Sequence, residues 1–158
     1  MCLAPRVPNL MRGFTMVELV TSIVIMGILA AAIGPKFFDN KSFSERGYAD
    51  EVAAALRYAQ AVAVASGCGV AVTLAANNYL ALQPANGPPA CNGGWNRAVT
   101  LVDGGTLTGA APNGVVLAPA AQIVFNAQGR IVGNPPLVFS AGGFNLSVEA
   151  VSGLVSVQ

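Results

Sequence analysis

Hydrophobic residues are concentrated in one uninterrupted run near the start of this chain. Residues 14–33 contain a single ionisable side chain, Glu18, among 20 positions. An α-helix rises about 1.5 Å per residue, so a helix of this length matches the bilayer hydrocarbon core, which is about 30 Å thick. The pattern therefore predicts a transmembrane helix with one carboxylate close to its N-terminal end.

Glu18 lies in the second turn of this run. A charged side chain inside a membrane costs about 2.5–3.5 kcal/mol at the bilayer centre, and less near a helix end. An acid at such a position is therefore a candidate functional group that needs a partner. The alternative is a plain anchor whose carboxylate reaches the lipid headgroups and has no further role.

A second helical pattern follows the polar stretch at residues 39–46. Apolar side chains recur there at steps of three and four residues, which is typical of an amphipathic helix: Tyr48, Val52, Ala55, Leu56, Ala59, Ala63 and Val64. The opposite face carries the polar side chains of Asp50, Glu51, Arg57 and Gln60. We expect the two adjacent acids, Asp50 and Glu51, to be solvated.

One long helix over residues 14–66 fits both patterns. Gly34 and Pro35 interrupt it, and a proline removes one helical hydrogen bond, so we expect a kink there without an end. Gly67 is well placed to cap the C-terminus of the helix.

After Gly67 the pattern changes to short segments separated by glycine, proline and asparagine, which is typical of antiparallel strands. We expect a loop at residues 84–96 and strands at residues 69–75, 79–83, 98–102, 106–108, 114–117, 122–126, 130–132, 137–140, 144–149 and 154–157. The apolar stripe of the helix needs a surface to cover, and these strands supply it. The sequence thus predicts an α+β fold, with a long N-terminal helix, its first half transmembrane, packed against the antiparallel β-sheets of a small globular domain.

Composition argues against catalysis. The chain is 54% hydrophobic and 9% charged, and it contains no histidine, whereas soluble domains average about 25% charged residues. The sequence has no metal-ligand cluster, phosphate-binding glycine loop or nucleophile–base motif. A serine or cysteine triad would need an unusual base without histidine. We expect neither an enzyme nor a cofactor.

The start of the apolar run, Gly13-Phe14-Thr15-Met16-Val17-Glu18-Leu19, resembles the processing site of type IV pilins and of the pseudopilins of type II secretion. The resemblance implies that prepilin peptidase cuts between Gly13 and Phe14 and that Phe14 is then N-methylated. It also implies that Glu18 recruits the subunit into a fibre by pairing with the N-terminal amine of a neighbour.

A second resemblance covers residues 43–158. It rests on Ala55-Leu56-Arg57-Tyr58-Ala59-Gln60, Ala65-Ser66-Gly67-Cys68, and Ile123-Val124-Phe125 with Gly129. This region is similar to the GspH/FimT branch of pseudopilins and minor pilins, and its helical part is particularly similar to a minor pilin of mannose-sensitive haemagglutinin (MSHA) pili. The family fold implied is a helix wrapped by two antiparallel sheets.

Together these observations divide the chain into four parts: a leader peptide (1–13), a transmembrane helix half (14–35), an amphipathic helix half (36–67) and a β globular domain (68–158). Met11 is an alternative start to Met1. The resemblance implies a single-pass protein of the bacterial inner membrane with its globular domain in the periplasm. Its expected partners are other major and minor pilins, prepilin peptidase, the inner-membrane assembly platform and membrane lipid.

Two cysteines remain if the leader, with Cys2, is removed. In an exported domain, Cys68 and Cys91 predict a disulfide because the periplasm is oxidising. The alternative is two unpaired buried thiols.

The expected function is that of a minor pilin that helps to start, cap or assemble a type IV pilus-like fibre. The alternatives are a GspH-type pseudopilin of a type II secretion system and a minor pilin that binds DNA for uptake. Removal of Arg6 and Arg12 with the leader leaves six basic and seven acidic side chains, and residues 98–158 hold one basic residue, Arg130. DNA binding relies on several phosphate contacts, so nucleic acid is not an expected partner.

Overall fold

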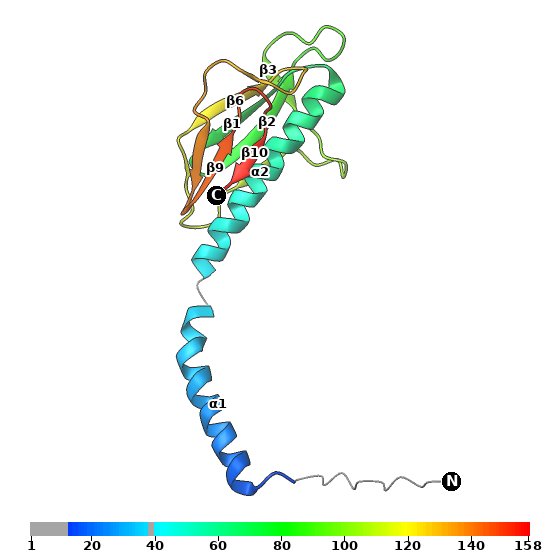
Figure 1. Ribbon diagram of the computed structural model, residues 1–158. Coiled ribbons are helices and arrows are strands. Elements are labelled where there is room, and N and C mark those ends of the chain that lie inside the picture. The colour runs from blue at the N-terminus through cyan, green and yellow to red at the C-terminus, as the bar shows by residue number, and fades with distance from the viewer. Residues whose placement is uncertain (1–12, 38–39) are drawn as a thin grey trace, which may run out of the picture. The chain divides into compact units, whose positions relative to one another are not determined.

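The computed structural model describes residues 13–37 and 40–158, with side chains described outside residues 31–40. The chain forms two compact units, Met1–Asp39 and Asn40–Gln158. The first contains helix α1 (Met16–Phe37), and the second begins with helix α2 (Asn40–Ser66) (Figure 1). The single helix expected over residues 14–66 thus corresponds to two helices, and the residues that would join them, 38 and 39, lie outside the described residues.

Helix α1 continues through Gly34 and Pro35 to Phe37, so these residues do not end the helix, as predicted. Large apolar side chains are exposed along its described part, from Phe14, which precedes the helix and is 76% exposed, to Leu29, which is 53% exposed. Counted over residues 13–37 and 40–158, neither helix combines the length and the apolar character that a membrane crossing requires.

Helix α2 is amphipathic in the predicted manner, except that Val64, expected on the apolar face, is 52% exposed. Its buried face includes Tyr48, Val52, Leu56, Ala59 and Ala63, each no more than 1% exposed. The alanines on this face let the helix backbone approach the strands closely. The helix packs against strands of two separate sheets (Figure 1).

The larger sheet has the strand order β3-β2-β1-β6-β7, with β4 also paired to β2. Its strands are β1 (Val70–Ala75), β2 (Asn78–Pro84), β3 (Trp95–Ala98), β4 (Thr108–Ala110), β6 (Ala121–Phe125) and β7 (Ile131–Val132). The smaller sheet has the order β10-β9-β8-β5. Its strands are β5 (Leu117–Ala118), β8 (Val138–Ala141), β9 (Phe144–Val148) and β10 (Val155–Val157).

All of these strand pairs are antiparallel. Strand β1 is central, because Val72 lies opposite Ala81 of β2 on one side and Ile123 of β6 on the other. The core between α2 and the two sheets is completed by fully buried Phe125 and Phe139. The α+β class with antiparallel sheets is confirmed.

The strands between β2 and β6 differ from the prediction. Strand β3 begins at Trp95, inside the expected loop at residues 84–96, and the expected strands at 98–102 and 106–108 form instead a short hairpin arm. Thr100 and Thr106 form a single bridge in this arm, and the Gly105 amide donates to the Asp103 Oδ1 in its turn. The physical reason is that β2 is paired at one end by β3 and at the other by β4, and Ala81 of β2 still bonds to Val99 and Leu107, so only the chain between Val99 and Leu107 leaves the sheet.

On the polar face of α2, Asp50 and Glu51 are exposed, as predicted, and three of the polar side chains of this face also make hydrogen bonds. Tyr79 donates a hydrogen bond to the Glu51 Oε1 (2.9 Å), and Arg57 donates to the Val155 carbonyl (2.8 Å). The Gln60 amide donates to the carbonyls of Gly129 (2.9 Å) and Ser152 (2.8 Å). Arg57 and Gln60 thus satisfy backbone carbonyls of β10 and of two turns, whereas Glu51 accepts from a side chain of β2.

Gly109 of β4 provides a test of this edge packing. A Cβ at this position would meet the Tyr79 ring and the Glu51 carboxylate, whereas a Cβ at Gly47, in α2, would have no neighbour within 4 Å. We expect Gly109→Ala to lower the free energy of unfolding by about 1–3 kcal/mol, because the packed pair must shift. Gly47→Ala should raise it by up to about 1 kcal/mol, because alanine favours a helix interior.

Urea unfolding of the full chain in detergent, followed by circular dichroism, measures both changes. Equal stability of Gly109→Ala and the unmodified chain would contradict the packing of Glu51 and Tyr79 described above.

Candidate functional site

The predicted processing site lies at the start of α1. Gly13 and Phe14 are exposed and precede the helix, which begins at Met16. The rest of the predicted leader, with Cys2, lies outside the described residues. The scissile bond predicted between Gly13 and Phe14 is therefore in non-helical backbone, a short distance from the first turn.

Thr15 caps this helix. Its Oγ1 accepts a hydrogen bond from the Glu18 amide (3.3 Å), and its carbonyl accepts one from the Leu19 amide (3.1 Å). This is the N-cap arrangement, and Thr-x-x-Glu is the spacing of a capping box. This signal is present in the sequence, where Glu18 was predicted only as an intramembrane acid. A carboxylate in the first turn also interacts favourably with the helix dipole.

Two further hydroxyl groups near Glu18 are satisfied within the helix. Thr21 Oγ1 donates to the carbonyls of Val17 (2.9 Å) and Glu18 (3.1 Å), and Ser22 Oγ donates to the Glu18 carbonyl (2.7 Å). Such bonds remove the cost of placing a hydroxyl in apolar surroundings. Within the described part of the chain, the Glu18 carboxylate has no ion-pair or hydrogen-bond partner, and the residue is exposed.

The surface around Glu18 is strongly apolar. Met16 is 84% exposed, Val17 72% and Leu19 58%, and further along the helix Ile23 and Met26 are exposed as well. Apolar side chains that point in all directions need an apolar environment on all sides, whether lipid or other helices. The geometry thus brings the predicted residues Gly13, Phe14 and Glu18 together in one short segment with an apolar surface.

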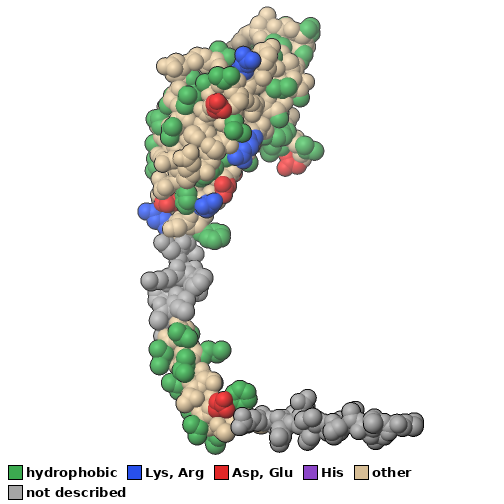
Figure 2. Space-filling model, in the orientation of Figure 1, with side chains coloured by type: hydrophobic (Ala, Val, Ile, Leu, Met, Phe, Trp, Pro, Cys, Tyr) green, Lys and Arg blue, Asp and Glu red, His purple; other side chains and the backbone are tan. Residues whose placement is uncertain are grey.

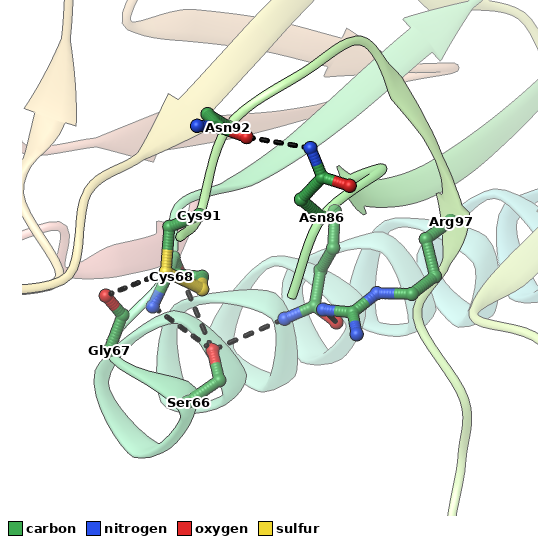
Figure 3. The surroundings of a disulfide bond; sticks show 8 residues. Ser66, Gly67, Cys68, Asn86, Cys91, Asn92 and Arg97 are labelled. Carbon is green, nitrogen blue, oxygen red and sulfur yellow. Dashed lines mark hydrogen bonds between the residues drawn. A yellow bond between two sulfur atoms is a disulfide. The ribbon is translucent and has the colours of Figure 1, made fainter. Parts of the chain in front are cut away.

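The predicted disulfide is confirmed. Cys68 and Cys91 are bonded, with their Cα atoms 5.2 Å apart, so they are not two free thiols (Figure 3). Gly67, with φ of +67°, ends α2 as expected of a cap, and Cys68 follows it as a buried residue before β1. Cys91 lies in the loop between β2 and β3, and the bond therefore ties this loop to the end of α2.

The loop at residues 85–94 has its own hydrogen bonds. The Ala85 amide donates to the Gly94 carbonyl (2.8 Å), and the Asn86 amide donates to the Asn92 carbonyl (3.0 Å). The side chains of Asn86 and Asn92 are bonded at 2.7 Å (Figure 3). The disulfide thus holds a loop that is already closed at its base.

The unit Asn40–Gln158, called the globular unit from here on, contains a cluster of titratable side chains, Tyr48, Glu51 and Tyr79. Burial, followed by the hydrogen bond to Glu51, raises the pKa of Tyr79 above its ordinary value of 10.0. Burial, followed by the charge of Glu51, also raises the pKa of Tyr48. Both phenols are therefore neutral at physiological pH, and the cluster offers no activated nucleophile. Over the described residues, no group of three or more metal-ligating side chains occurs.

Basic side chains of the globular unit are mostly engaged within it. Lys41 and Arg46 lie 3.9 Å from the carboxylates of Glu45 and Asp50, and the Arg46 guanidinium also lies 5.4 Å from the centre of the Phe144 ring. On the face seen in Figure 2, lysine and arginine side chains are scattered and not gathered in a patch. This face offers no continuous track for a phosphate backbone.

Comparison with known proteins agrees with this division of the chain. The family described as "Type II transport protein GspH" matches residues 48–157, and the "Prokaryotic N-terminal methylation motif" matches residues 9–34. A curated relative, the type IV narrow pilus major component PilA5 of Thermus thermophilus, is 41% identical over 59 residues, which are 37% of this chain and 51% of the relative.

The matched part thus spans about half the length of that relative. No solved structure matches the chain. The GspH match covers most of the globular unit, and the methylation motif covers the segment that contains Gly13, Phe14 and Glu18. The chain therefore belongs to the GspH family of type IV pilin-like proteins and carries their N-terminal methylation motif.

Proposed function

We propose that this chain is a minor pilin that is anchored in the bacterial inner membrane by α1. The chain presents its globular unit in the periplasm. It joins a type IV pilus-like fibre and helps to start, cap or assemble that fibre. The observation that carries this proposal is the capped apolar helix. It has one unpartnered carboxylate in its first turn and follows directly on an exposed Gly13–Phe14 bond.

The anchoring role rests on the apolar run at residues 14–33 and on the exposed apolar side chains of its described part. Burial of such side chains in lipid is favourable by roughly 25 cal/mol per Å². Thr21 and Ser22 do not oppose insertion, because their hydroxyls already donate to helix carbonyls. Residues 31–33 complete the proposed anchor, although their side chains lie outside the described part.

Glu18 has a different environment in the two proposed states. In the free subunit it lies near the headgroups, where the carboxylate stays hydrated. In a fibre it is surrounded by apolar helices, where an unpaired charge is costly. After processing, the methylated amine of Phe14 is a cation close to this segment, so the Phe14 amine of a neighbouring subunit is the natural partner. A medium of low dielectric strengthens this pairing.

The finer assignment favours a pilus and a minor role. A pilus is supported by the similarity to PilA5, whose name describes a major component of a pilus and therefore does not itself favour the minor role. A minor role is supported by the likeness of residues 55–60 and 65–68 to a minor pilin of MSHA pili. The second candidate is a pseudopilin of a type II secretion system, which the description of the matching family favours.

We propose no enzymatic or nucleic-acid-binding role. Four of the five basic residues with described side chains, Lys41, Arg46, Arg57 and Arg97, are held in contacts within the protein. DNA binding relies on several phosphate contacts, and the carboxylates beside Lys41 and Arg46 would repel a phosphate, so DNA uptake is disfavoured as a direct function.

The first test concerns processing. Mass spectrometry of the membrane-extracted protein is expected to show a chain that begins with N-methylated Phe14. A bulky side chain should prevent the peptidase from fitting the residue before the cut, so Gly13→Leu should retain its leader, while Gly13→Ala is cut slowly. Gly27→Ala, a glycine substitution within the apolar run, is the control and should be processed normally. An intact leader on the unmodified chain in cells with active peptidase would contradict the proposal.

The second test concerns Glu18. Glutamine at this position keeps the capping-box residue type and removes only the charge, whereas leucine removes both. We expect Glu18→Gln and Glu18→Leu to insert and be processed, yet to support fewer fibres by electron microscopy than the unmodified chain. Glu149→Gln, on the globular unit, is the matched control and should leave fibre number unchanged. A normal number of fibres with Glu18→Leu would show that Glu18 is not the recruiting group.

A further inference from the structure

A chain of non-covalent contacts connects the two cysteines by a route separate from their disulfide. Its centre is Gln83, which lies at the end of β2 and is 8% exposed. The Gln83 Oε1 accepts a hydrogen bond from Arg97 Nη2 (3.0 Å), and its Nε2 donates to Ser66 Oγ (3.2 Å). One buried amide therefore joins the end of α2 to β3.

Each end of this chain of contacts reaches one cysteine. On one side, Ser66 Oγ accepts a hydrogen bond from the Cys68 amide (3.3 Å). On the other side, the Arg97 guanidinium lies against Gly87, where an added Cβ would be 2.6 Å from Nη1, and the Gly87 carbonyl accepts from the Cys91 amide (3.1 Å). Figure 3 shows Ser66, Arg97 and the disulfide in one view.

We propose that Gln83 and Arg97 are positioning residues for the disulfide: they hold the loop at residues 85–94 against the end of α2, so that Cys91 lies beside Cys68 before the two are oxidised. Holding two reacting groups together raises their effective concentration, because the loop no longer has to find the contact by diffusion. This inference concerns the folding chemistry of the chain and does not depend on its role in a fibre.

The burial of Gln83 favours the contacts that hold the two strands at the base of the loop. Arg97 lies opposite Gln83 on the neighbouring strand, so moving β3, which follows the loop, away from β2 would leave the Gln83 Oε1 without its charge-assisted bond in a site with little access to water. A buried acceptor left without a partner is costly. The coupling is reciprocal, so the contacts favour the disulfide by the same factor by which the disulfide favours the contacts.

The oxidation itself is an ordinary exchange with an oxidant disulfide such as oxidised glutathione. The thiolate of one cysteine attacks a glutathione sulfur, which forms a mixed disulfide and releases one reduced glutathione. The thiolate of the second cysteine then attacks the protein sulfur of the mixed disulfide and releases the second. The two cysteines are oxidised and one glutathione disulfide is reduced, with both thiol protons passed to solvent or to the leaving thiolates.

The test measures this exchange at equilibrium. The full chain, with Cys2→Ser so that only two thiols react, is held in detergent in mixtures of reduced and oxidised glutathione, and the Cys68–Cys91 bond is counted by alkylation and mass spectrometry. We expect Gln83→Leu and Arg97→Met each to lower the effective concentration of the two thiols by about twofold to tenfold, the range of one net hydrogen bond. The double variant should lose no more than the larger single loss, because the removal of either residue interrupts the same chain of contacts.

Gln122→Leu is the matched control, because the Gln122 amide is bonded to Thr73 Oγ1 (3.3 Å) between β6 and β1. Its Cys68–Cys91 bond should form at the same ratio of oxidised to reduced glutathione as in the unmodified chain. Arg97 is exposed, so Arg97→Met decides the question even if Gln83→Leu does not fold. An Arg97→Met chain that titrates like the unmodified protein, or an equal loss in Gln122→Leu, would overturn the proposal.

Discussion

The burial of one face of α2 is the interaction on which the rest of the globular unit depends. Val52, Leu56, Ala59 and Ala63 are all fully buried, and strands of both sheets cover them. Removing this apolar face from water is the main driving force for bringing together two sheets that do not share a strand. Each sheet alone would expose the apolar side of its strands, such as Phe125 on β6 and Phe139 on β8.

The polar contacts of the unit follow from this packing. Once the sheets lie on α2, strand ends and turns meet the edges of the helix, and polar side chains there satisfy backbone groups. Near the start of the helix, Glu45 accepts a hydrogen bond from the Gly143 amide in the turn between β8 and β9 (3.2 Å). At its end, Ser66 is bonded to Gln83, and the disulfide ties Cys68 to the loop after β2. The helix is thus held to the sheets at both ends as well as along its face.

Patterns that depend on local periodicity were predictable from the sequence. The apolar stripe from Tyr48 to Ala63 identified α2, and alternation of apolar and polar residues identified β1, β2 and β6 to within about a residue at each end. The resemblance to pilins identified the segment from Gly13 to Glu18, which the methylation motif then matched. These features are encoded by residues close together in the chain.

Features set by contacts between distant segments were not predictable. Strand β3 begins at Trp95 because β2 offers an open edge there, and nothing near Trp95 signals it. Glu51 is exposed, as predicted for a solvated acid, but its hydrogen bond with Tyr79, which is 28 positions away, has no local signal. Gln83 had no motif at all, and its importance appears only when Ser66 and Arg97 converge on it. Thr15 is the exception, since its capping signal was local and was overlooked.

The most direct measurement of the central claim is the composition of isolated surface fibres. Fibres sheared from cells and purified are analysed by quantitative mass spectrometry for peptides of residues 40–158 and for the N-terminal peptide that begins at Phe14. The account predicts that the trimmed, methylated chain is present in the fibres, at far fewer copies than their main subunit. Two results together would contradict the account: the fibres lack the chain, and deletion of the chain stops protein secretion but leaves fibre number unchanged. These results would favour the secretion pseudopilin.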